Sequence, residues 1–276
     1  MVFVSHENKF IFIHIPKTGG QTIKTTLKKN VKNDFNHREC NTLDYAILSN
    51  DCTVKNKTTM FRSPRHFTLN NIKNTYPSNY YRFTFTRNPY DRFYSTYNHF
   101  KHRIYRFLYI LIPINIVLLT LFIYSVLKKK YLYMTLLLLT ILFINIYIGI
   151  YMEYFRWTTD LIALDFNSFT KKNIYELDNS LYGDLYKSQY EYIKDNRIDY
   201  IGRQENFKND FNALLKHFNL DSTIHSNNVR NPNDYNGEYK YIHKYDKETI
   251  ELINTRYNID FKKFNYEKVT NELTNQ

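Results

Sequence analysis

The sequence predicts an α/β fold, a parallel sheet flanked by helices, interrupted by a transmembrane hairpin of two helices. Two strand–turn–helix units in the N-terminal part predict the sheet, because strands that alternate with helices are typical of parallel sheets. Two long uncharged segments in the middle of the chain predict the hairpin. We therefore divide the sequence into the N-terminal half of one domain (1–103), a hairpin insert (104–152), the C-terminal half of the same domain (153–270) and a short tail (271–276).

The first unit places a lysine and two glycines between a strand and a helix. Phe10–Ile15 has the alternation of a strand, Pro16–Gln21 forms the turn, and a helical pattern begins at Thr22. Glycines at such a place let backbone N–H groups face a ligand, and the helix N-terminus adds the positive end of its dipole. Lys17 adds a full charge, so we expect this turn to cradle an anion. The spacing is not that of a Walker A loop, and a plain strand-to-helix turn is the alternative.

The second unit also ends its strand with a cation. Tyr81–Thr86 is the expected strand, Arg87 follows it, and Pro89 suits the first turn of the next helix. Arg87 and Ser95, about two turns into that helix, could bind one phosphate; a salt bridge from Arg87 to Asp91 is the alternative. Two anion-binding turns on one sheet predict a ligand with two separated anionic groups.

The uncharged segments are residues 107–127 and 131–152, joined by Lys128, Lys129 and Lys130. As helices each would span roughly 30 Å, the thickness of the hydrocarbon core of a bilayer. A pair of buried core helices is the alternative, but a domain of this size has little room for them. We therefore expect a lipid bilayer as partner. The N-terminus lacks the pattern of a signal peptide, which favours flanking segments that face the cytosol.

The composition limits the partners further. The chain of 276 residues has 38 Lys and Arg against 26 Asp and Glu, which suggests anionic partners. The excess is spread along the whole length without a basic block, so we expect no nucleic acid. The two cysteines, Cys40 and Cys52, form no metal-binding pattern and could pair only in an oxidising compartment. The residues after the hairpin have a mainly helical pattern, with helices expected near 186–194, 206–218 and 247–257.

Several motifs together resemble the membrane-associated carbohydrate sulfotransferases, relatives of heparan sulfate 2-O-sulfotransferase and the chondroitin and dermatan enzymes. "FIHIPKTGGQT" is similar to their 5′-phosphosulfate loop, and "FTRNPYDRFYSTY" is similar to their 3′-phosphate motif. "RHFTLNNIKNTYP", "IDYIGRQENFKNDFNALLKHFNL" and "YDKETIELINTRYNIDFKKFNY" resemble further segments of these enzymes in the same order. The resemblance implies the P-loop-like sulfotransferase fold and transfer of a sulfuryl group from 3′-phosphoadenosine 5′-phosphosulfate (PAPS) to a carbohydrate hydroxyl, without a metal. The chain departs from the family in its hairpin, which replaces the usual N-terminal anchor. The resemblance implies the Golgi lumen as the alternative to a catalytic domain that faces the cytosol.

The resemblance also implies roles for individual residues. Lys17 would stabilise the leaving phosphate, and Arg87 and Ser95 would hold the 3′-phosphate. The phosphosulfate would be held by Lys17, Thr18, Gly19, Gly20, Gln21 and Thr22. Gln21 replaces the more usual Thr or Ser, although its amide can still donate a hydrogen bond.

The proton acceptor is less clearly marked. His66 matches a family histidine and suits proton abstraction near pH 7, against the alternative of a surface loop histidine. Glu205 is a further candidate, while His14 is expected to be a packed strand residue, and Arg203 is expected to be structural. Two other classes of function stay open: a kinase-like nucleotide enzyme, and a non-catalytic membrane scaffold that keeps the fold.

Overall fold

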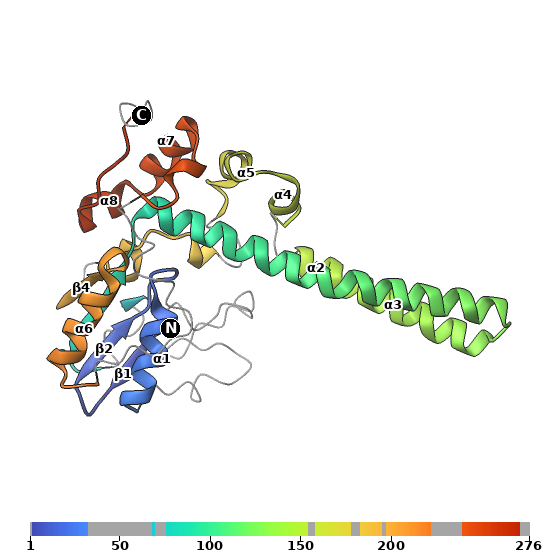
Figure 1. The fold of residues 1–276 in the computed structure, drawn as a ribbon, viewed down its shortest axis with the longest axis horizontal. Coiled ribbons are helices and arrows are strands. Elements are labelled where there is room, and N and C mark those ends of the chain that lie inside the picture. The colour runs from blue at the N-terminus through green and yellow to red at the C-terminus, as the bar shows by residue number, and fades with distance from the viewer. Residues whose placement is uncertain are drawn as a thin grey trace.

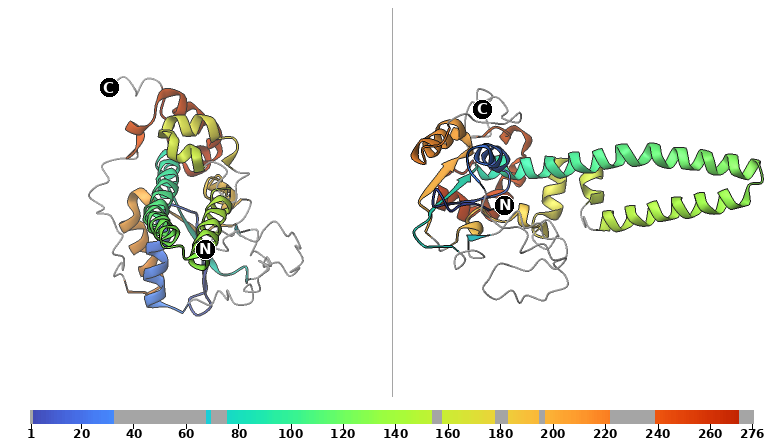
Figure 2. Two further views of the ribbon diagram at one scale, coloured as in Figure 1. Left: turned by 90° about the vertical axis from the view of Figure 1, so that its right-hand side faces the viewer. Right: turned by 90° about the horizontal axis from the view of Figure 1, so that it is seen from below.

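The computed structural model describes residues 2–32, 68–69, 76–153, 158–177, 183–194, 197–221 and 239–270. Among these residues a small sheet and its helices form one body, from which a helical hairpin extends (Figures 1 and 2). The strands are β1 (Phe3–Ser5), β2 (Phe10–Ile13), β3 (Tyr81–Thr86) and β4 (Tyr200–Arg203). The α-helices are α1 (Gly20–Asn30), α2 (Pro89–Leu127), α3 (Tyr131–Glu153), α4 (Thr158–Ala163), α5 (Phe166–Asn173), α6 (Phe207–His217), α7 (Lys247–Arg256) and α8 (Asn258–Phe264).

The sheet has the order β1-β2-β3-β4, and β2, β3 and β4 run parallel. Phe12 pairs with Phe83, and Phe83 pairs with Tyr200. The predicted parallel sheet is therefore confirmed for these strands. It differs at its edge, where β1 pairs antiparallel with β2 through a tight turn that has φ 52° at Lys9. β4 was not expected either, because its four residues lie in a stretch with a mainly helical pattern.

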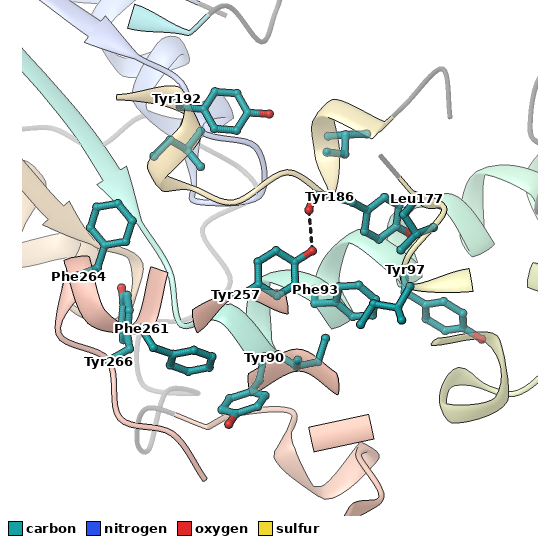
Figure 3. Close-up of a cluster of buried hydrophobic side chains, with 14 of the residues drawn as sticks. Tyr90, Phe93, Tyr97, Leu177, Tyr186, Tyr192, Tyr257, Phe261, Phe264 and Tyr266 are labelled. Carbon is teal, nitrogen blue, oxygen red and sulfur yellow. Dashed lines mark hydrogen bonds between the residues drawn. The ribbon is translucent and has the colours of Figure 1, made fainter. Parts of the chain in front are cut away.

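Successive strand residues point to opposite faces of the sheet, and each face carries its own core. On one face, Phe10, Phe12, Phe83 and Phe85 pack with apolar residues of α1 and α6. On the other face, residues of β2 pack with the first turns of α2 and with α5, α7 and α8. Many members of this second core are tyrosines (Figure 3). Several of their hydroxyl groups are hydrogen-bonded inside the core; Tyr257, for example, donates to the carbonyl of Tyr186 at 2.6 Å.

The hairpin consists of α2 and α3, which lie antiparallel on either side of a turn at Lys128 and Lys129 (Figure 1). α2 begins at the second predicted turn and continues without a break across the expected boundary at residue 103. Large apolar side chains are exposed along both helices, for instance Leu119 at 53% and Leu139 at 60%. This exposure contradicts the alternative of two buried core helices. Of the described residues, only α2 is a helix long and apolar enough to cross a membrane, because the apolar stretch of α3, Tyr131–Ile144, is shorter.

Candidate active site

The first turn of the site, Pro16–Gly20, connects β2 to α1 and is closed by its own backbone. Lys17 has φ 68° and Gly19 has φ 86°, both in the left-handed region. Thr18 is buried, and its hydroxyl donates to the carbonyl of Ile15 at 2.8 Å. The side chain of Thr18 therefore stabilises the turn, and only its backbone remains for a ligand. α1 begins directly at Gly20, so the N–H groups of its first turn are at the end of the loop.

Both glycines of this turn lie against other side chains. A Cβ atom on Gly19 would lie 2.3 Å from Oε1 of Gln204, and one on Gly20 would lie 2.0 Å from the ring of His14. His14, directly after β2, is half-buried and packs over the start of α1, in keeping with the expected packed histidine. The two glycines are thus needed for close packing of the turn, and Gly19 also for its backbone conformation.

The second turn, Arg87–Pro89, connects β3 to α2 and is held by side chains from distant segments. The backbone N–H of Arg87 donates to Oε1 of Gln189 at 2.9 Å, and Nε2 of Gln189 donates back to the carbonyl of Arg87 at 2.7 Å. The N–H of Asn88 donates to Oε1 of Glu205 at 2.7 Å. The side chain of Asn88 in turn accepts from the N–H of Tyr90 at 3.0 Å and caps α2.

The two turns are in direct contact. Nη1 of Arg87 donates to the carbonyl of Lys17 at 3.3 Å. Arg92, on the first turn of α2, is buried and donates from Nε to the carbonyl of Pro16 at 3.1 Å. Arg87 also lies over the ring of Tyr241, 5.8 Å from its centroid. The structure therefore brings Lys17 and Arg87 together although they are 70 residues apart in the sequence.

Asp91 and Glu205 both hold backbone in place. Asp91, the expected partner of Arg87 in the alternative interpretation, accepts from the backbone N–H groups of Lys240 and Tyr241 at 3.3 and 2.9 Å. Glu205 accepts from Asn88 and from the hydroxyl of Tyr266. Burial raises the pKa of the Glu205 carboxyl, and these hydrogen bonds and the charge of Arg87 act in the opposite direction. The oxygens of Glu205 are thus occupied at the second turn, which makes this residue a poor candidate for the proton acceptor.

The other predicted site residues differ in how deeply they are buried and in what they contact. Gln21 is exposed and Thr22 is buried on the first turn of α1, while Ser95 is half-buried on α2. Arg203 donates to the carbonyl of Phe264 at 2.9 Å and lies over the ring of Tyr266, in keeping with a structural role. His66, Cys40 and Cys52 lie outside the described residues.

Sequence reasoning missed three residues of this region. Gln189 holds the backbone of Arg87, and no local pattern indicates a contact over that separation. Arg92 joins α2 to the first turn; it lies in the motif "FTRNPYDRFYSTY", but nothing in that motif indicates this contact. Part of the His99 side chain, farther along α2, reaches solvent, but partial burial, followed by the charges of Lys17, Arg103 and His102, lowers its pKa to about 4. Its periodic position on the helix could have drawn attention to it.

Comparison with known proteins supports a sulfotransferase family for the first part of the chain. Residues 1–117 match the model of the sulfotransferase family, and this stretch contains both turns and ends inside α2. No curated protein and no solved structure matches the chain. Within the described ranges, no group of histidine, cysteine and carboxylate side chains could hold a metal ion. The family match and the two joined turns thus fall on the same residues.

Proposed function

We propose that this protein is a sulfotransferase that moves a sulfuryl group from PAPS to a hydroxyl of a carbohydrate or glycan. The observation that carries the proposal is the contact between the two cationic turns, through the bond from Arg87 to the carbonyl of Lys17. PAPS has two separated anionic groups, the 5′-phosphosulfate and the 3′-phosphate. Two turns with one cation each, at adjacent strand ends, suit such a ligand.

The first turn would bind the phosphosulfate. Its left-handed backbone at Lys17 and Gly19, and the start of α1 at Gly20, provide backbone N–H groups for an anion. Gly20 and Gln21 would contribute their N–H groups there, Thr18 its backbone and Thr22 its side chain, since the N–H of Thr22 donates to the carbonyl of Gly19 at 2.9 Å. The ammonium group of Lys17 would stabilise the charge that develops on the leaving phosphate oxygen.

The second turn would bind the 3′-phosphate through Arg87 and Ser95. Arg87 presents a planar guanidinium that suits a phosphate, and its backbone is fixed on both sides by Gln189. His66 remains the prediction for the proton acceptor from the resemblance alone.

We further propose that the hairpin lies in a lipid bilayer through residues 107–127 and 131–152. The exposed apolar side chains of α2 and α3 support this, as does the length of α2. Both ends of the hairpin then lie on one side of the membrane, for which we favour the cytosol over the Golgi lumen. Protease treatment of sealed microsomes tests this side: cleavage of the domain without detergent is expected, and full protection would contradict it.

Calorimetric titration of the full chain in detergent tests the donor. We expect 3′-phosphoadenosine 5′-phosphate (PAP), the desulfated product, to bind, and ATP with Mg²⁺ to bind more weakly. A kinase-like enzyme would prefer ATP with Mg²⁺, and a non-catalytic scaffold would bind neither. Transfer of labelled sulfate from PAPS to a panel of glycans then identifies the acceptor.

A further inference from the structure

The segment that holds the second turn is itself held by a carboxylate from a distant helix. Gln189, which contacts both backbone groups of Arg87, is completely buried, and so is Asp260 in the first turn of α8. One carboxylate oxygen of Asp260 accepts from the N–H of Gln189 at 2.8 Å. The other accepts from the hydroxyl of Ser188 and from the N–H of Tyr190, the latter at 2.9 Å. Asp260 therefore holds three successive residues, with Gln189 in the middle.

A buried carboxylate needs partners that compensate for its lost hydration, and Asp260 has two kinds. Burial raises the pKa of its carboxyl, while the positive charge of Arg92 and the hydrogen bonds described above act in the opposite direction. Arg92 in turn donates to the carbonyls of Pro16 and Leu185, each at 3.1 Å. Asp260 thus belongs to the buried polar groups that surround both turns of the candidate site.

The rest of the segment is anchored by contacts that do not involve Asp260. The hydroxyl of Tyr257 donates to the carbonyl of Tyr186 (Figure 3), and the hydroxyl of Tyr192 donates to the carbonyl of Asp184. These contacts keep residues 184–192 attached to the core. The hydrogen bonds of Asp260 act on residues 188–190, where the amide of Gln189 has to face the second turn. Their role is therefore orientation of this amide more than attachment of the segment.

We propose that Asp260 is a positioning residue for donor binding, an inference that rests on the proposed function. Asp260 fixes the backbone at Gln189, the amide of Gln189 fixes the backbone of Arg87, and the guanidinium of Arg87 is thereby held toward the 3′-phosphate. Of these three residues only Arg87 would touch the donor. Loss of Asp260 should therefore lower the affinity for the 3′-phosphate and leave the affinity for the rest of the nucleotide nearly unchanged.

Two nucleotides that differ only in the 3′-phosphate test this assignment: PAP has this group, and adenosine 5′-monophosphate (AMP) lacks it. In Asp260→Asn an amide donor replaces one of the accepting oxygens and faces other donors. In calorimetric titrations of the full chain in detergent, we expect this variant to raise the Kd for PAP by about 10-fold and the Kd for AMP by less than about twofold. With PAPS as substrate, kcat should fall by a smaller factor than the factor by which KM rises.

Asn173→Leu is the matched control. Asn173 is a buried amide on α5 that donates to Asp160 and to the carbonyl of Phe169, away from both turns. Its loss should lower the free energy of unfolding but leave the ratio of the Kd values for AMP and PAP unchanged.

Two further variants separate positioning from a general loss of stability. In an Arg87→Ala background, Asp260→Asn should not raise the Kd for PAP further, because the group that it positions is absent. Gln189→Met removes both contacts with Arg87 and leaves Asp260 in place, so it should reproduce the effect of Asp260→Asn. It also provides the test if Asp260→Asn does not fold.

The ratio of the Kd values for AMP and PAP decides the outcome. An unchanged ratio in folded Asp260→Asn or Gln189→Met, including equal weakening of both nucleotides, would overturn the inference and leave the proposed function intact. A wild-type protein that does not distinguish PAP from AMP would overturn the assignment of the second turn to the 3′-phosphate, and this inference with it.

Discussion

The two turns of the candidate site reach the same edge of the sheet by different means. The first turn, Pro16–Gly20, is shaped mainly by its own backbone, with positive φ angles at Lys17 and Gly19 and a hydroxyl of Thr18 that closes it locally. The second turn, Arg87–Pro89, has ordinary local structure, and remote side chains fix it. The comparison teaches that a reactive lysine can be placed by local sequence, whereas the position of the arginine depends on the packed fold.

The contact between the turns is asymmetric as well. Arg87 and Arg92 both donate to carbonyls of the first turn, at Lys17 and Pro16. The first turn therefore depends on α2 for its orientation. Substitutions in each turn, and in the residues that connect them, should affect kcat, PAP affinity and the free energy of unfolding to different extents.

Lys17→Ala should have the largest effect, because it removes the charge nearest to the leaving group. We expect kcat to fall by about 1,000-fold, with little loss of stability, since the side chain is only half-buried. Sulfate transfer from labelled PAPS and thermal unfolding measure the two quantities. Lys28→Ala, at an exposed position of α1, is the control; a similar loss there would point to a general electrostatic effect.

Arg92→Met should chiefly cost stability. It leaves the buried carbonyls of Pro16 and Leu185 without this donor and removes a positive charge near the buried Asp260. We expect the free energy of unfolding in urea to fall by about 3 kcal/mol. Arg106→Met, at an exposed position of the same helix, should change it little. Equal stability of both variants would mean that α2 does not orient the first turn.

Arg87→Ala should weaken donor binding more than catalysis. Loss of one charged hydrogen-bonding partner of the 3′-phosphate corresponds to about 2 kcal/mol, or roughly a 30-fold higher Kd for PAP. At saturating PAPS, kcat should change much less, because the 3′-phosphate is remote from the reacting sulfur. Arg197→Ala, which breaks a surface ion pair with Asp199, is the control for loss of a charge. An unchanged Kd would reject the assignment of this turn to the 3′-phosphate.

Gly19→Ala tests the local design of the first turn. The left-handed φ of 86° and the approach of Gln204 Oε1 to 2.3 Å from the added Cβ should together cost about 1–2 kcal/mol of stability. Combined with Gln204→Ala, the loss should be smaller than the sum of the two single losses, because one clash disappears. Strict additivity in urea unfolding would show that the contact with Gln204 does not matter and that the cost comes from the backbone conformation and from Phe207, 2.9 Å from the added Cβ.

Glu205→Gln should have the smallest effect and one that depends on pH. Burial raises the pKa of this carboxyl above its ordinary 4.5, so the folded state holds the proton more tightly than the unfolded state. Glu205 therefore contributes stability at low pH, and that contribution is lost as pH rises through the folded pKa. The wild type should lose stability relative to Glu205→Gln when urea unfolding is compared from pH 4.5 upward. A difference that does not vary with pH would contradict the raised pKa.

Local patterns were enough to predict much of this molecule. Alternation in Phe10–Ile15 and Tyr81–Thr86 predicted two strands of one sheet, and the position of Lys17 and the glycines between a strand and a helix predicted the first turn. The uncharged segments predicted a transmembrane hairpin of two helices; the structure confirms the helical hairpin, and its position in a membrane stays a prediction. These features depend on residues close together in the chain, whose spacing can be read directly.

Other features depended on contacts between distant segments, and the sequence did not indicate them. β4 is a short strand in a stretch of mainly helical pattern, and it forms only because β3 supplies a parallel partner. The bidentate contact of Gln189 with Arg87 joins residues 102 apart, and the role of Glu205 at Asn88 joins residues 117 apart. An amide or carboxylate residue is the same letter in the sequence whether its side chain faces water or binds a buried backbone group. The sequence by itself therefore determined which turns carry the cations, and the tertiary structure decided which neutral and acidic side chains hold those turns together, because that choice depends on burial and not on spacing.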